Sequence, residues 1–131
     1  MLELAVSPIY VAIIAILMAV LSTLAGAKRG ATGIPLGDGG RSDLALAVRR
    51  FGNLSEYAAI LLILLVLMEV KGVQDQWLHL YGSTLVTLRI LHPFVLFDDM
   101  GVPFWRKAGR FVSAGGTALL LVSGSIVILS L

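Results

Sequence analysis

The sequence predicts an all-α integral membrane protein, a bundle of four transmembrane helices forming one domain over residues 1–131. Of its 131 residues, 58% are hydrophobic and 14% are charged. A soluble domain of this length could not bury so much apolar surface in its core. Four segments are long and apolar enough to cross a bilayer, which takes about 20 residues. They lie at about 9–27, 44–70, 77–97 and 108–131, and breaker-rich segments separate them.

The first two spans have recognisable ends. Pro8 suits the first turn of a helix. The run ends at Ala25-Gly26-Ala27, which is loosely like a signal-peptide cleavage site, but three spans follow and Lys28-Arg29 comes after the run, so we expect no cleavage. A glycine-rich loop over 30–43 leads to Ser42-Asp43, which can cap the second helix. Lys71-Gly72 ends that helix, with glycine near the C-cap.

The last two spans flank an acidic loop. The third contains Pro93, which predicts a kink. Asp98-Asp99, Gly101 and Pro103 form the loop, and a basic group then opens the fourth helix. These elements give no sign of a domain boundary, so we expect one bundle.

The basic residues predict how the chain lies in the membrane. Loops one and three, with the adjoining helix ends, hold eight of them, whereas the termini and loop two hold only Lys71. The eight are Lys28, Arg29, Arg41, Arg49, Arg50, Arg106, Lys107 and Arg110. The positive-inside rule therefore places loops one and three in the cytoplasm and both termini outside. Because the bases flank apolar spans, the net charge of +2 indicates orientation, and we expect no nucleic-acid partner. The chain has no cysteine, so we expect neither disulfides nor a thiolate metal site, and because His92 has no Glu or Asp at ligand spacing we expect no other metal site.

The second span carries polar residues where lipid-facing side chains would be apolar. Arg49, Asn53 and Glu56 are spaced i, i+4 and i+7, which places them on one helix face. Ionisable residues inside a membrane usually mark a binding or transport path. A cation, an amide and an anion in this order suit a small zwitterionic ligand. Alternatively, Arg49 anchors the helix end by snorkelling, as we expect for Arg50, and the other two form a polar clasp between helices.

Other polar residues allow two interpretations each. Tyr57 lines the same site or is an interfacial aromatic. Arg89 and His92, at i and i+3 on the third span, bind ligand, or Arg89 forms an internal salt bridge, most simply to Glu56. Arg106 and Arg110 either stabilise the thiolate of a bound ligand, because neighbouring cations lower the pKa of a thiol, or are ordinary basic residues at the cytoplasmic interface. The small residues over 113–117 permit close helix contact.

The run Arg49-x-x-x-Asn53-x-Ser55-Glu56-Tyr57 resembles the signature of the MAPEG family, the membrane-associated proteins of eicosanoid and glutathione metabolism. The likeness extends through most of the chain and is closest to the small bacterial inner-membrane branch. It implies a four-helix bundle that assembles as a homotrimer, with glutathione bound between subunits near the cytoplasmic side.

The resemblance also implies roles for single residues. Arg49 would hold a glutathione carboxylate, Asn53 would hydrogen-bond its polar atoms, and Glu56 would pair with its ammonium. Tyr57 would support the pocket. Lys28, or alternatively Arg29, would reach the neighbouring subunit's ligand. Arg89 and His92 match an Arg-x-x-His pattern of the prostaglandin-synthase branch.

The chain departs from the family pattern in two places. Leu96 stands where relatives often have tyrosine, and Arg106 and Arg110 both compete for the position of the arginine that activates the thiol. These departures concern the reaction more than the binding of glutathione.

Three functions follow as expectations. The first is a glutathione transferase or peroxidase of the microsomal type, using glutathione as co-substrate against apolar electrophiles from the bilayer in detoxification. The second is a non-catalytic protein that binds lipid or another hydrophobe. The third, a small multidrug exporter, ranks lowest because such carriers place a carboxylate in helix one, and this chain has no ionisable residue between Glu3 and Lys28.

Overall fold

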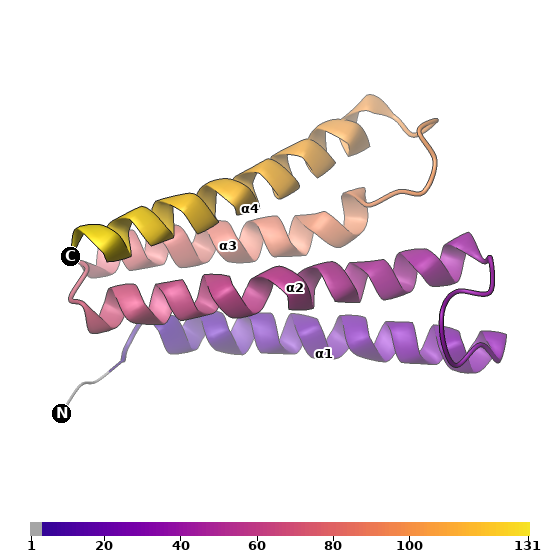
Figure 1. Cartoon of the computed structure of the whole chain (residues 1–131), viewed down its shortest axis with the longest axis horizontal. Helices are drawn as coiled ribbons and strands as arrows, with labels where there is room; N and C mark the ends of the chain where they lie inside the picture. The colour runs from indigo at the N-terminus through magenta and orange to yellow at the C-terminus, as the bar shows by residue number, and fades with distance from the viewer. Residues whose placement is uncertain (1–3) are drawn as a thin grey trace.

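The computed structural model describes residues 4–131, and these form four α-helices joined by short loops. The helices are α1 (Ser7–Thr32), α2 (Ser42–Val70), α3 (Asp75–Val95) and α4 (Phe104–Ser130). They run up and down in turn, so that the α1–α2 and α3–α4 loops share one end of the bundle (Figure 1). The start of α1, the end of α4 and the α2–α3 loop lie at the other end. The prediction of an all-helical bundle is confirmed.

The helix ends follow the glycines, with one shift from the sequence prediction. Past Val70, the N–H of Gly72 bonds the carbonyl of Glu69 and the N–H of Val73 bonds that of Met68, which is the Schellman arrangement. Gly72 has φ +80°, which glycine adopts without strain. The first helix continues beyond the predicted end at residue 27 and stops only at Gly33 (φ +69°).

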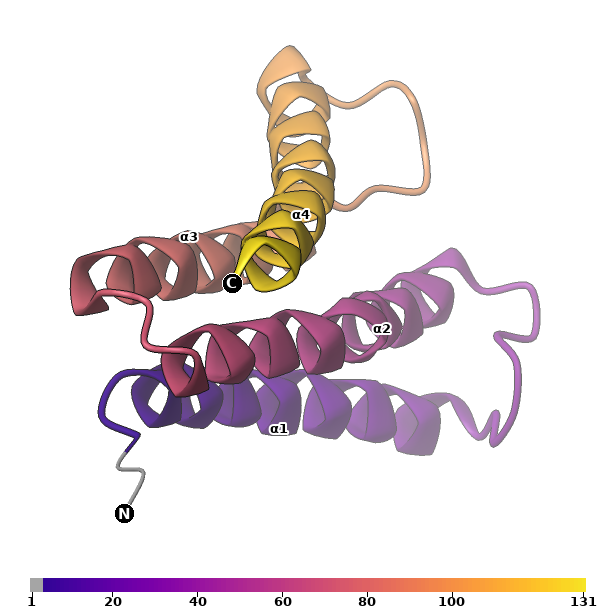
Figure 2. The same cartoon turned by 60° about the vertical axis from the view of Figure 1, so that its left-hand side comes forward.

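The α2 and α3 helices form the centre of the bundle. Each of them contacts all three other helices, whereas α1 and α4 do not contact each other within the described part of the chain. Figure 2 shows α4 steeply inclined to the other helices, rising away from the α1–α2 pair toward its N-terminal end.

The interior is packed with leucine side chains, and α3 approaches α1 closely at Gly82. Leu61, Leu65, Leu78 and Leu85 are fully buried. At Gly82 a Cβ atom would collide with the ring of Tyr10, so glycine is what allows α3 to approach α1 here. Large apolar side chains also cover the outside, as expected where lipid is the solvent.

Three of the four predicted spans, α1, α2 and α4, are long and apolar enough to cross a membrane. By the same measure α3, which has 21 residues, does not qualify, since polar residues such as Asp75, Arg89 and His92 interrupt it. An integral membrane protein follows from the three apolar helices.

Candidate functional site

The face of α2 that carries Arg49, Asn53 and Glu56 is called the charged strip below. Its two charged residues form an ion pair with each other. Nη1 of Arg49 lies 2.7 Å from Oε1 of Glu56, two turns along the helix. Their side chains are 55% and 51% exposed, so the pair lies on the surface of the single chain. The predicted alternative partner of Glu56, Arg89, is not its partner, because Arg49 is closer along the same face.

This ion pair lies deep along the helix. Glu56 is thirteen residues from Asp43, which pairs with Lys28 at one end of α1. It is also thirteen residues from Glu69, which binds the other end of α1. At 1.5 Å per residue, Glu56 is about 20 Å from each end. A half-exposed carboxylate at mid-span would be costly against acyl chains, so this face requires a covering of protein or polar ligand.

Asn53 takes part in a polar clasp that joins three helices. Its Oδ1 accepts a hydrogen bond of 2.9 Å from Nη1 of Arg89 on α3. Nη2 of Arg89 donates to the Ser113 carbonyl at 3.2 Å and to the Thr117 hydroxyl, both on α4. The guanidinium group is thus held by neutral acceptors, and the sequence-based salt bridge between Arg89 and Glu56 is wrong.

His92 extends the clasp by one turn. Its Nδ1 lies 3.0 Å from the Ser113 hydroxyl, and its side chain is buried. Close helix contact makes this possible: a Cβ atom on Gly116 would stand 2.7 Å from Leu88. The predicted role of the small residues in helix contact is confirmed at Gly116, whereas Gly115 has open space beside it.

A small cavity lies beside the clasp. Its volume is about 100 Å³. Residues of all three helices line it, namely Asn53, Tyr57, Arg89, His92, Ala114, Thr117, Ala118 and Leu121. Tyr57 is 38% exposed, with the Arg89 guanidinium carbon 5.8 Å from the centroid of its ring. Ligand pockets usually measure about 300–1,000 Å³, so one chain alone does not enclose a tripeptide here.

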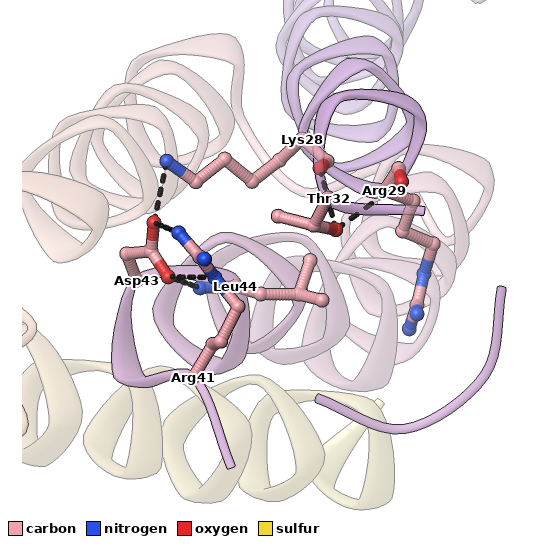
Figure 3. Close-up of polar contacts among 6 residues, drawn as sticks. All are labelled: Lys28, Arg29, Thr32, Arg41, Asp43 and Leu44. Atoms are coloured by element: carbon pink, nitrogen blue, oxygen red, sulfur yellow. Dashed lines mark hydrogen bonds and ion pairs between the residues drawn. The ribbon is translucent and has the colours of Figure 1, made fainter. Parts of the chain in front are cut away.

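The basic residues at the end of α1 point in different directions (Figure 3). Lys28 reaches across to α2, where its Nζ lies 2.7 Å from Oδ2 of Asp43, an atom that Arg41 also contacts at 3.0 Å. Arg29 extends away and donates to the carbonyls of Ile34 and Gly37 at 3.2 and 2.8 Å. Within one chain, Lys28 therefore joins α1 to the start of α2, and Arg29 holds the first loop.

The two arginines of α4 lie beside the end of α3. Nη2 of Arg106 donates to the Leu96 carbonyl at 2.7 Å, and Nη1 of Arg110 donates to the Phe97 carbonyl at 3.4 Å. The Arg110 guanidinium also stacks 4.7 Å from the Phe97 ring. Arg106 is half-buried and Arg110 is exposed, so both remain candidates for contact with a bound thiol.

Comparison with known proteins decides the family. The family model described as "MAPEG family" matches residues 7–126, which covers α1, α2 and α3 and most of α4. The chain belongs to the MAPEG family. Two curated relatives match as well, both named inner membrane protein YecN, from Escherichia coli strain K12 and from strain O6:H1. Each is 35% identical over 89 residues, or 68% of this chain, and the match spans 65% of the relative's length. No solved structure matches the chain significantly.

In this MAPEG protein, positive charge is concentrated around the clasp. The segments 49–57, 89–95 and 104–117 contain five arginines and one lysine, and Glu56 is their only carboxylate. Such a surplus in a low-dielectric region attracts anions. The charged strip, the clasp and the α4 arginines together suit a ligand that is anionic overall and has at least one ammonium group.

Sequence reasoning missed two partners in the clasp. Ser113 and Thr117 were expected only as small residues for helix contact, yet they are the acceptors for Arg89 on α4. Their spacing of i and i+4 was the available signal for the two hydroxyl groups, because it puts them on one face, but the Ser113 acceptor for Arg89 is a backbone carbonyl that the sequence does not mark.

Proposed function

We propose that this protein binds glutathione between the subunits of a homotrimer and transfers its thiolate to apolar electrophiles that enter from the bilayer. Arg49 holds a carboxylate of the tripeptide, Asn53 bonds its polar atoms and Glu56 pairs with its ammonium. Tyr57 supports the pocket, and the clasp of Arg89 and His92 backs it.

The observation that carries the proposal is the half-exposed Arg49–Glu56 pair at mid-span. A zwitterionic ligand can insert between the two side chains by exchanging partners: its carboxylate replaces Glu56 on Arg49, and its ammonium replaces Arg49 on Glu56. Neither protein charge is left uncompensated before or after binding, which avoids the cost of a lone charge in a membrane. An apolar ligand could make no such exchange.

A second copy of the chain covers the exposed side of the ligand site. The cavity beside Asn53 is too small for a tripeptide, and the charged strip has no cover in one chain. Lys28, or Arg29, of a neighbouring protomer is the cation that the family pattern would bring to this face. We therefore also propose that the chain forms a trimer and that α3 is the fourth transmembrane span, shielded from lipid by its neighbours.

Arg106 or Arg110 stabilises the thiolate. A free thiol has a pKa of about 8.5, which a neighbouring guanidinium lowers. The sulfur then forms a bond to an electrophilic carbon, and the leaving group departs with the bonding electron pair. With a hydroperoxide substrate the thiolate takes the terminal oxygen and an alcohol leaves, and a second glutathione then releases water and forms the disulfide.

The relatives support a location. They are named inner membrane proteins, and we propose the same membrane here, with loops one and three in the cytoplasm, where glutathione is available. The charged strip then lies between the cytoplasmic end and the middle of the bilayer.

The test measures glutathione binding by calorimetry and conjugation with a chlorinated nitroarene, using purified protein. We expect Arg49→Ala and Glu56→Gln each to weaken binding at least about tenfold, the cost of one charged contact. Arg41→Ala, which removes an exposed loop arginine, is the matched control and should bind normally. Wild-type affinity in both strip variants would refute the site, and native mass spectrometry tests the trimer.

One feature favours the non-catalytic alternative. A wider cavity of about 580 Å³ lies at the opposite end of the bundle, lined mainly by apolar side chains of α2, α3 and α4 and of the α2–α3 loop. It lies between Met68, Trp77 and Val127, among others. Binding of a hydrophobe that is independent of glutathione and sensitive to Gly124→Leu would support this alternative.

A further inference from the structure

The guanidinium of Arg89 carries a positive charge that the chain solvates but does not neutralise. The residue is 2% exposed. Its three contacts are an amide oxygen, a backbone carbonyl and a hydroxyl, which are all neutral. None of the ion pairs formed by residues 4–131 includes it. Neutral dipoles lower the cost of burying a charge, but a buried ion without a counter-charge still costs several kcal/mol.

Its neighbours increase the positive potential. Arg49 and Arg50 lie one turn before Asn53 on α2, and Arg110 lies one turn before Ser113 on α4. The one nearby carboxylate, Glu56, is engaged by Arg49 at 2.7 Å. The surroundings therefore supply further cations but no free anion.

The adjacent cavity has the size and lining for a small anion. An engineered apolar cavity of about 150 Å³ holds benzene, so a space of about 100 Å³ suits a smaller guest. The lining residues Asn53, Tyr57 and Arg89 carry hydrogen-bond donors, whereas the Thr117 hydroxyl already donates to the Ser113 carbonyl. The amide of Asn53 gives its oxygen to Arg89, which leaves its NH₂ group as the donor for a guest. His92, whose Nε2 has no partner in the described chain, also lines the space.

We propose that this cavity binds one monovalent anionic group no larger than a carboxylate, as the counter-charge of Arg89. A free anion such as a halide and a carboxylate of a larger ligand share this chemistry. The cavity shares Asn53 and Tyr57 with the proposed glutathione site, but its cation is buried and has no acidic partner among the described residues, whereas Arg49 is paired with Glu56. It does not depend on glutathione binding, since a halide alone tests it.

The experiment follows thermal unfolding of the purified full-length protein as bromide replaces a bulky sulfonate buffer anion at constant ionic strength. A ligand of the folded state raises the midpoint temperature with concentration. We expect a saturable rise for the wild type and none for Arg89→Gln, whereas Lys71→Gln, an exposed control just past the end of α2, should respond as the wild type does. No rise in the wild type, or the same rise in Arg89→Gln, would overturn the inference.

A second variant tests the charge argument without removing the arginine. Asn53→Asp places a carboxylate at the atom that already accepts from Arg89 at 2.9 Å. It should therefore raise the midpoint in sulfonate buffer and abolish the response to bromide. An Asn53→Asp protein that still responds to bromide as the wild type does would contradict the inference, even if Arg89→Gln fails to fold.

Addition of glutathione separates the two sources of the anion. If a free anion occupies the cavity, bromide at saturation leaves the affinity for glutathione unchanged or improves it. If a carboxylate of the tripeptide enters instead, the two compete, and bromide weakens glutathione binding in proportion to its occupancy. Either result keeps the anionic site. If glutathione does not bind at all, the proposed function fails while the bromide response still stands.

Discussion

The carboxylate of Glu69, in the last turn of α2, accepts the backbone N–H of Ser7, the first residue of α1, at 2.7 Å. The same carboxylate accepts the N–H groups of Ala5 and Val6, also at 2.7 Å. The start of α1 has no side-chain cap of its own, so a residue 62 positions away in the sequence caps it. This contact fixes the position of α1 relative to α2 along the axis of the bundle.

Removing that carboxylate should therefore loosen the pair of helices. We expect Glu69→Ala to lower the free energy of unfolding by about 1–3 kcal/mol, the cost of leaving donors unpaired or losing bonds to a charged acceptor. Thermal unfolding in detergent measures it, with Lys71→Ala as the control. Equal stability of the two variants would show that the cap contributes nothing.

The contact between Gly82 and Tyr10 predicts a steric effect. A Cβ atom at position 82 would meet the tyrosine ring at three carbons. Overpacking of this kind costs about 1–3 kcal/mol, so Gly82→Ala should unfold at lower temperature. Gly26, with open space around it in α1, provides the control: Gly26→Ala should be neutral or slightly stabilising. The same measurement on both variants decides the matter.

The clasp predicts that Thr117 matters more than its size suggests. Its hydroxyl accepts from Arg89 and donates to the Ser113 carbonyl at 2.6 Å. Thr117→Val keeps the shape but removes an acceptor from a buried cation, and we expect a loss of about 1–3 kcal/mol. Thr87→Val, on the exposed face of α3, is the matched control. A stable Thr117→Val protein would mean that the remaining acceptors suffice.

The absence of cysteine makes the orientation directly measurable. We expect Gln74→Cys, in the α2–α3 loop, to react with a membrane-impermeant maleimide in intact cells, because the charge distribution places that loop outside. Asp38→Cys, in the α1–α2 loop, should react only after the membrane is opened. The opposite pattern would invert the topology and place the charged strip nearer the outer side.

Periodicity and composition were sufficient for the helices, because a long apolar run has few alternatives in a bilayer. Their ends were predicted within a few residues where glycine marked them, as at Gly72. The first loop was misplaced because Lys28, Arg29 and Ala31 are good helix formers that carry α1 past Gly30, and the helix stops only at Gly33.

The candidate site divides in the same way. The i, i+4, i+7 spacing placed Arg49, Asn53 and Glu56 on one face, since helix geometry is local. It could not show that Arg49 would bind Glu56 while Arg89 binds Asn53, because several pairings of these four residues satisfy the same pattern. Which pairing forms depends on how far α3 and α4 slide along α2.

The amino-acid order alone thus determined a membrane-embedded helical chain with a polar face on its second helix, because hydropathy and helical periodicity are properties of neighbouring residues. Only the tertiary structure decided that Glu69 caps α1, that Gly82 admits Tyr10, and that Arg89 lies buried among neutral acceptors. Those contacts join residues far apart in the chain, and their geometry is set by side-chain packing between helices, which no local pattern encodes.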